Sequence, residues 1–151
     1  MDKITISSLN LWYGTFHALK EVHLKIPAQK ITALIGPSGC GKSTLLRVLN
    51  RMNDLIEGVR MDGNVEVDGT NILDPLTDLV ALRKKIGMVF QRPNPFPLSI
   101  YENLVFGLKI HEKRLPKSTL DEAVEMSLKS VLLWDELKGK LKKPALSLSL
   151  E

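Results

Sequence analysis

The 151-residue chain has little cysteine, few aromatic residues and no long apolar run. Because Cys40 is its single cysteine, no internal disulfide can form, which fits a protein from a reducing compartment. No apolar run approaches the roughly 20 residues that a membrane-spanning helix needs. The N-terminal residues also lack the basic and then apolar layout of a secretory signal peptide. These absences together predict a cytosolic protein.

Composition and charge exclude several classes of protein. Hydrophobic residues make up 44% and charged residues 25% of the chain, which excludes a disordered, collagen-like or coiled-coil protein. The 21 Lys and Arg against 17 Asp and Glu give a formal net charge of +4, which suits nucleic acid, an anionic membrane or a phosphate ligand equally. The basic cluster over residues 138–143 contains no aromatic residue, so we expect a solvated face and no nucleic-acid partner.

Apolar periodicity predicts a strand-rich first part of the chain. Short apolar runs and alternating apolar residues are typical of strands, and apolar residues three and four apart are typical of helices. Strands are expected over residues 3–11, 22–26, 31–35 and 86–90, a hairpin turn at Asp68-Gly69, and helices over 42–52 and 79–84.

The pattern changes at a proline-rich segment. Three prolines within residues 92–97 forbid regular structure there, and we place a subdomain boundary in this segment. Ser99 and Glu102 then form a capping-box pattern that starts a helix through about residue 108. Ser118 and Asp121 form a similar pattern at the start of a longer helix.

A phosphate-binding loop is the clearest motif of the chain. Residues 36–44 match G-x-x-x-x-G-K-[ST] and lie between an apolar run and a helical pattern. Small residues let consecutive backbone N–H groups curl around a phosphate chain, and the following helix aims its positive end at the same phosphates. Lys42 can reach the β- and γ-phosphates, and the Ser43 hydroxyl can bind Mg²⁺. The candidate nucleotide-binding residues here are Gly36, Pro37, Ser38, Gly39, Cys40, Gly41, Lys42, Ser43 and Thr44.

With this loop, the chain resembles the ATP-binding subunits of ABC transporters, those of phosphate importers in particular. The family places an aromatic residue upstream of the loop to stack on adenine, and Tyr13 within Leu11-Trp12-Tyr13-Gly14 matches it. The family also places a glutamine after a strand, where it reaches Mg²⁺ and the attacking water, and Gln91 matches it. The narrower resemblance to phosphate importers rests on residues 51–56, 91–103 and 141–149.

The resemblance implies the fold, the cofactors and the partners. It implies an α/β P-loop NTPase that binds ATP and Mg²⁺ and couples ATP hydrolysis to phosphate uptake in the intact importer. It also implies a homodimer of ATPase subunits at the cytoplasmic face of the membrane, with membrane-spanning permease subunits docking on about residues 92–106. On this basis, residues 1–91 hold an antiparallel β subdomain and the phosphate-loop part of the core, and residues 92–149 form a helical subdomain. Residues 150–151 resemble a cloning scar.

The same resemblance predicts an incomplete core sheet. The family signature begins at Leu148-Ser149 and is then replaced by Leu150-Glu151, and the catalytic carboxylates that follow it in the family are not in the sequence. We therefore expect the chain to bind nucleotide at most and not to hydrolyse it. The strands expected at 31–35 and 86–90 would lack their neighbours, which favours self-association or non-parental pairing.

Two other functions stay open from the sequence. One is a P-loop nucleotide-binding module of another class, such as a kinase, although residues 98–143 contain only Arg114 where a kinase lid carries several arginines. The other is a structural fragment that binds no ligand.

Overall fold

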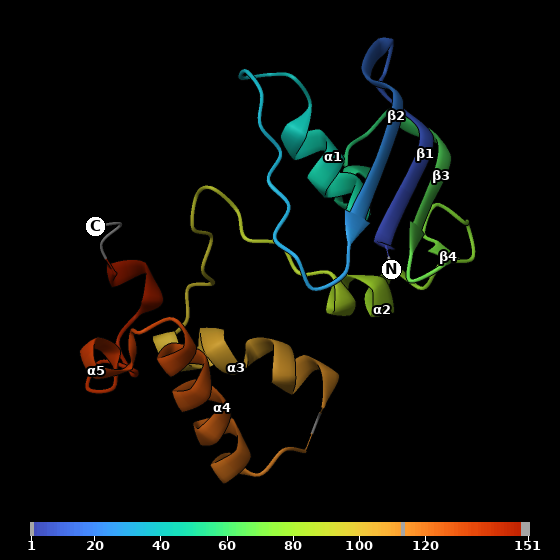
Figure 1. The fold of residues 1–151 in the computed structure, drawn as a ribbon. Helices are drawn as coiled ribbons and strands as arrows, with labels where there is room; N and C mark the ends of the chain where they lie inside the picture. The colour runs from blue at the N-terminus through green and yellow to red at the C-terminus, as the bar shows by residue number, and fades with distance from the viewer. Residues whose placement is uncertain (1, 113, 149–151) are drawn as a thin grey trace. The chain divides into compact units, whose positions relative to one another are not determined.

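The computed structural model describes residues 2–112 and 114–148 and divides the chain into two compact units, Met1–Val89 and Phe90–Glu151 (Figure 1). The first unit holds all the strands and two α-helices of the described residues, and the second holds three α-helices. The candidate phosphate loop belongs to the first unit and Gln91 to the second.

An antiparallel sheet forms the centre of the first unit, with strand order β2-β1-β3-β4. The alternation of apolar residues that predicted strands near 3–11 and 22–26 produces two long paired strands, so both predictions are confirmed. A two-residue turn containing Gly14, with φ at 57°, joins them. The strands are β1 (Asp2–Tyr13), β2 (Phe16–Pro27), β3 (Val59–Val67) and β4 (Thr70–Asn71).

Helix α1 (Lys42–Leu49) supplies the other half of the core of this unit. Its apolar residues lie three and four positions apart, so they face the sheet together. A 3-10 helix, η1 (Met52–Leu55), follows it, and α2 (Leu79–Lys85) packs Leu82 into the same core. The buried core consists of Ile6, Leu9, Leu11, Leu19, Leu45, Val48, Leu49, Val65, Val67, Ile72 and Leu82.

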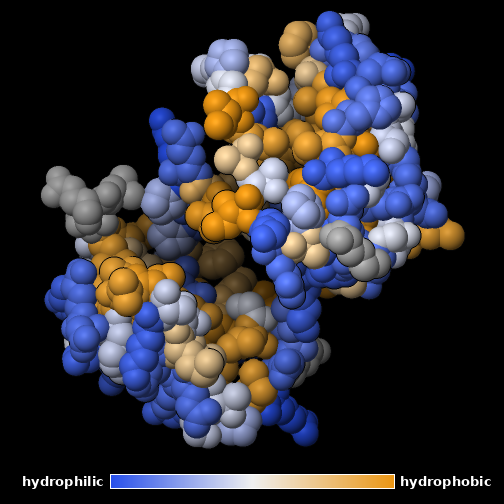
Figure 2. All heavy atoms as spheres, viewed as in Figure 1, coloured by the Kyte–Doolittle hydropathy of each residue, from blue (hydrophilic) through white to orange (hydrophobic). Residues whose placement is uncertain are grey.

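Two predicted strands are wrong. Residues 31–35 have no regular structure, and residues 86–90 have none after a bend at Ile86. An extended segment becomes a strand only when a neighbouring chain takes up its N–H and C=O groups, and the described residues offer these segments no partner strand. The side chains of Ile31, Ile35 and Val89 are consequently fully exposed, and exposed apolar side chains stand out in orange in Figure 2.

The helix predicted over 42–52 is shorter than expected. It ends at Leu49, and Arg51 adopts a left-handed backbone conformation with φ at 57°. A left-handed residue cannot continue an α-helix, so the chain reverses there and enters η1.

The second unit is helical, as the sequence predicts. Its helices are α3 (Ile100–His111), α4 (Lys117–Ser130), α5 (Trp134–Leu137) and the 3-10 helix η2 (Ala145–Ser147). The buried core consists of Ile100, Val105, Leu120, Val124, Leu128, Leu137 and Ala145.

The predicted start of α3 is confirmed, and the predicted start of α4 is not. The Ser99 hydroxyl accepts a hydrogen bond from the Glu102 N–H (3.1 Å), and the Glu102 carboxylate accepts one from the Ser99 N–H (3.1 Å), which is a complete capping box. Helix α4 instead begins at Lys117, with Pro116 at the N-cap position and no side-chain cap. Ser118 therefore lies inside the first turn. Within residues 2–112 and 114–148, no helix is long and apolar enough to cross a membrane.

Candidate functional site

The predicted phosphate loop lies immediately before α1 in the first unit (Figure 1). Residues 31–37 are irregular, residues 38–41 form a turn, and the helix begins at Lys42. The loop is almost entirely exposed, which leaves its backbone groups accessible to a ligand. At the N-cap stands Gly41, which has no side chain to accept from the N–H groups of the first helical turn.

Two glycines of the loop cannot be replaced without movement of the backbone or of a neighbour. Gly41 has φ at 94°, and a Cβ atom on it would lie 2.9 Å from Cδ2 of Leu19 on β2. A Cβ atom on Gly36 would lie 2.8 Å from Sγ of Cys40, across the loop. Gly36 and Cys40 therefore approach each other across the loop so closely that position 36 requires a residue without a side chain.

The Lys42 side chain folds back over the loop. Its Nζ atom donates hydrogen bonds to the carbonyl oxygens of Gly36 (2.8 Å) and Pro37 (2.7 Å), and lies 3.5 Å from Sγ of Cys40. The ammonium group thus sits at the mouth of the loop, beside the first turn of α1. A lysine held there brings a positive charge to the place where the helix also attracts anions.

Ser43 and Thr44, the last two residues of the motif, have different surroundings. Ser43 is exposed in the first turn of α1, so its hydroxyl is accessible. Its neighbour Thr44 is half-buried, and the Thr44 hydroxyl faces inward to the hydroxyl of Tyr13 at 3.4 Å. Loop amides, a lysine and a serine hydroxyl together fit the phosphates of a nucleotide with a bound Mg²⁺ ion. Among the described residues there is no cluster of three or more His, Cys, Asp or Glu that could hold a metal ion by itself.

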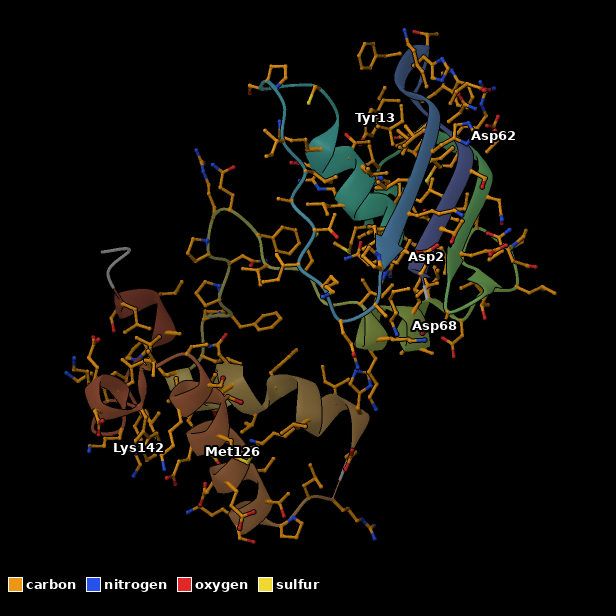
Figure 3. The ribbon with its side chains drawn as sticks, in the orientation of Figure 1. Asp2, Tyr13, Asp62, Asp68, Met126 and Lys142 are labelled. Carbon is orange, nitrogen blue, oxygen red and sulfur yellow. The ribbon has the colours of Figure 1, made fainter. Side chains whose placement is uncertain are left out.

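Strand alternation decides which aromatic residue faces the loop. Successive residues of a strand point to opposite faces of the sheet. Trp12 stacks on His17 (4.2 Å between ring centroids) and carries the Arg60 guanidinium 4.4 Å above its ring. Tyr13 packs instead against the core shared with α1, and it lies beside that helix in Figure 3. The structure therefore brings Tyr13, and not Trp12, to the helix that begins at the phosphate loop.

Gln91 belongs to the second unit, whereas the phosphate loop belongs to the first. It is exposed and lies in a bend that begins the proline-rich segment. Its predicted role with Mg²⁺ and the attacking water therefore stays a prediction.

One side chain that links these elements was missed in the sequence. Asn53 is completely buried in η1 and bonds both to Tyr13 and to the backbone of Thr44. In the sequence it is only one residue of the stretch 51–56, and no spacing rule marks it. Asn53 reaches the first turn of α1 because the chain reverses at Arg51, and this contact is seen only in the structure.

Comparison with known proteins identifies the class. Residues 19–150 match the family model described as ABC transporter. A relative from Vibrio vulnificus (strain YJ016), named phosphate import ATP-binding protein PstB 1, is 55% identical over 146 residues, which are 97% of this chain and 53% of the relative. The protein of the same name from Vibrio parahaemolyticus serotype O3:K6 (strain RIMD 2210633) is 54% identical over 146 residues, with the same coverage of both chains.

The chain belongs to the ABC transporter family and carries part of its P-loop NTPase domain, an α/β fold. It spans about half the length of the curated relatives it matches.

Proposed function

We propose that this chain binds ATP with Mg²⁺, as part of the ATP-binding subunit of an ABC importer for inorganic phosphate. The observation that carries the proposal is the position of the Lys42 ammonium, on the carbonyls of Gly36 and Pro37 at the mouth of a loop that opens into α1. The similarity to proteins named phosphate import ATP-binding protein supports phosphate as the transported solute. In the intact importer, hydrolysis of the bound ATP would drive phosphate uptake.

Each site residue then has a role that its surroundings support. The loop amides and Lys42 bind the β- and γ-phosphates, and the exposed hydroxyl of Ser43 coordinates Mg²⁺. The ring of Tyr13 stacks on adenine, supported by its position on the side of the sheet that faces α1. Gln91 positions the attacking water and Mg²⁺ in the intact ATPase.

Titration calorimetry with Mg-ATP tests the nucleotide proposal. Replacement of Lys42 by Ala removes a charge-assisted contact and should weaken ATP binding by roughly 1.5–3 kcal/mol, about tenfold to a hundredfold. The matched control is Lys20→Ala, which removes an exposed lysine from β2 and should leave the affinity unchanged. Equal ATP affinity in the native chain and the Lys42→Ala variant would falsify the assignment of the phosphate loop.

We propose that residues 92–106 dock on the membrane-spanning permease subunits, which would place the protein at the cytoplasmic face of the membrane. Phe96 supports this proposal because it is 48% exposed and is held in place from behind. The Asn103 side chain accepts from the Phe96 N–H (2.8 Å) and donates to the Phe96 carbonyl (3.1 Å), and the Phe96 ring lies 4.2 Å from that of Phe106. A fixed, half-exposed aromatic side chain is typical of an interface anchor.

Co-purification with the permease subunits tests the docking proposal in the full-length subunit. Phe96→Ala should reduce assembly, whereas Met126→Ala removes an exposed apolar residue of α4 outside the segment and should not. Unchanged assembly of the Phe96→Ala subunit would contradict the proposal.

We also propose that the ATPase subunits form a homodimer in the importer, and that this chain self-associates when alone. The support for self-association is the full exposure of Ile31, Ile35 and Val89, since open apolar segments pair readily with another chain. Light scattering at micromolar concentration should give a mass above that of the monomer, and a monomer mass would count against the proposal.

A further inference from the structure

Asn53 connects two parts of the proposed nucleotide site through one buried side chain. Its Oδ1 atom accepts a hydrogen bond from the Tyr13 hydroxyl (3.1 Å), and its Nδ2 atom donates to the backbone carbonyl of Thr44 (3.0 Å). Tyr13 ends β1, and Thr44 lies in the first turn of α1, two residues after Lys42. The Asn53 amide thus joins the aromatic residue to the start of the helix that follows the phosphate loop, beside the longer direct contact of the Tyr13 and Thr44 hydroxyls (3.4 Å).

Only an asparagine-like side chain satisfies both contacts. The Thr44 carbonyl can only accept, so the amide must turn its Nδ2 atom toward it, and Oδ1 is then left to face Tyr13. An aspartate could not donate to the carbonyl, and a leucine of similar size could make neither bond. Asn53 is 0% exposed, so water cannot replace a lost partner.

The backbone around Asn53 is fixed by charged contacts. Arg51 has φ at 57° and turns the chain back after α1. Its Nε atom donates to the Asp54 carboxylate (2.8 Å), and its Nη1 atom donates to the Ile72 carbonyl (2.6 Å). Arg83 on α2 donates to the Arg51 carbonyl (2.9 Å). These contacts connect the chain on both sides of Asn53 to α2 and to Ile72, which supports the position of the Asn53 amide.

We propose that Asn53 is a positioning residue for the base of the bound nucleotide. It holds the Tyr13 ring at a fixed place relative to the first turn of α1, and it thereby strengthens binding of the adenine part without touching the phosphates. The inference rests on the proposed function, because it assumes that Tyr13 stacks on adenine while the loop binds the triphosphate.

The test compares two ligands that differ only in the presence of the nucleoside. Dissociation constants for Mg-ATP and for Mg-tripolyphosphate are measured by titration calorimetry for the native chain and for Asn53→Leu. We expect the variant to bind ATP about threefold to tenfold more weakly and tripolyphosphate with an affinity within about twofold of the native value. A residue that merely stabilised the fold would weaken both ligands together.

Two further variants separate the positioning role from a loss of stability. Asn50→Leu is the matched control, because Asn50 is also buried but, within the described residues, its side chain bonds to the Met52 N–H (3.3 Å) and to neither Tyr13 nor Thr44. The ratio of the two dissociation constants should not change in this variant. Tyr13→Phe keeps the ring and Asn53 but removes the hydroxyl that joins them. It should reproduce the selective loss of ATP affinity, and Asn53→Leu added to it should cause little further loss.

Each outcome decides a different claim. If the native chain binds neither ligand, the proposed function fails, and the role of Asn53 fails with it. If the native chain binds both ligands equally, the phosphate loop stands but the adenine contact of Tyr13 and the role of Asn53 are excluded. If Tyr13→Phe leaves the ratio of the dissociation constants unchanged, or if Asn53→Leu weakens both ligands to the same extent, the positioning role is excluded although nucleotide binding stands.

Discussion

Arg83 on α2 donates a hydrogen bond from Nη2 to the backbone carbonyl of Arg51 at a distance of 2.9 Å. Its Nε atom also donates to the carbonyl of the preceding residue, Asn50, at 3.2 Å. Asn50 is the C-cap residue of α1, where helical acceptors have no partner within the helix. The Arg51 carbonyl follows it at the start of η1 and also accepts from the Asp54 N–H (3.4 Å). One arginine from a distant part of the sequence therefore completes the C-terminal end of the helix that begins at the phosphate loop.

Loss of this arginine should destabilise the first unit. Arg83→Met keeps most of the apolar stem but leaves the Asn50 carbonyl without this donor and the Arg51 carbonyl with only its longer bond from the Asp54 N–H (3.4 Å). We expect a loss of about 1–3 kcal/mol in the free energy of unfolding. Urea unfolding followed by circular dichroism measures it. Lys84→Met, at the exposed neighbouring position, is the control and should change the free energy by less than about 0.5 kcal/mol. Equal effects of the two substitutions would contradict the role of Arg83.

Asp68 should make the stability of the first unit depend on pH. It lies in the turn after β3, at the lower end of that strand in Figure 3, and its carboxylate accepts from Lys3 Nζ (2.9 Å) and pairs with Lys85. Hydrogen bonds from Lys3, then from Lys85, lower the pKa of Asp68 below its ordinary value. Because the pKa in the folded state is below that in the unfolded state, the stabilisation is complete above the unfolded value of about 3.9 and is lost as the pH falls through the folded value.

Asp68→Asn tests this dependence, since asparagine also tolerates the left-handed conformation of Asp68, where φ is 51°. The native chain should be more stable than the variant from neutral pH down to about pH 5, and the difference should shrink at lower pH. Asp62→Asn removes an exposed carboxylate from β3 and serves as the control. A difference between native chain and Asp68→Asn that stays constant down to pH 2 would exclude the ion pairs as its source.

The two serines near helix starts should differ in their contribution to stability. Ser99→Ala removes the hydroxyl that caps α3, and we expect a cost of about 1 kcal/mol in the stability of the second unit. Ser118→Ala changes a residue inside the first turn of α4 that caps nothing, so it should be neutral or slightly stabilising, since alanine favours helix. Thermal unfolding of the two variants measures the contrast. A larger loss of stability in Ser118→Ala than in Ser99→Ala would contradict the capping role of Ser99 and the lack of one at Ser118.

Alanine substitutions at two loop glycines should distinguish the cost of backbone strain from the cost of a steric contact. Gly39 and Gly41 both have positive φ, at 82° and 94°, so alanine is strained at either position by about 1–2 kcal/mol. A Cβ atom on Gly39 meets open space, whereas one on Gly41 lies 2.9 Å from Leu19. Gly41→Ala should therefore lower the melting temperature more than Gly39→Ala does. Equal melting temperatures would mean that Leu19 moves aside without cost.

Local signals in the sequence predict the parts of the fold that local contacts stabilise. The capping box at Ser99, the hairpin turn at Asp68-Gly69 and the phosphate-loop motif each act within a few residues, so their patterns can be recognised in one sequence. An apolar run such as 31–35 is different, because it indicates only a preference for an extended, buried segment. Whether it becomes a strand depends on a partner strand elsewhere, which the run itself does not encode.

The candidate site divides in the same way. The proposed phosphate-loop residues from Gly36 to Thr44 are found by a motif, because the motif fixes their spacing along the chain. Asn53 and Arg83 act across the chain reversal at Arg51, and their roles depend on tertiary placement alone. Buried polar contacts of this kind do not recur at a regular spacing in the sequence, so neither composition nor spacing predicts them.

Cys40 gives the loop a chemical handle. It is the single cysteine of the chain, it is exposed, and its sulfur lies 3.5 Å from the Lys42 ammonium. A thiol-reactive fluorophore would therefore attach once per molecule and directly beside the proposed seat of the phosphates. The rate of labelling of Cys40, measured with and without added nucleotide, would report whether the phosphate loop is occupied. No cysteine would have to be introduced for this measurement.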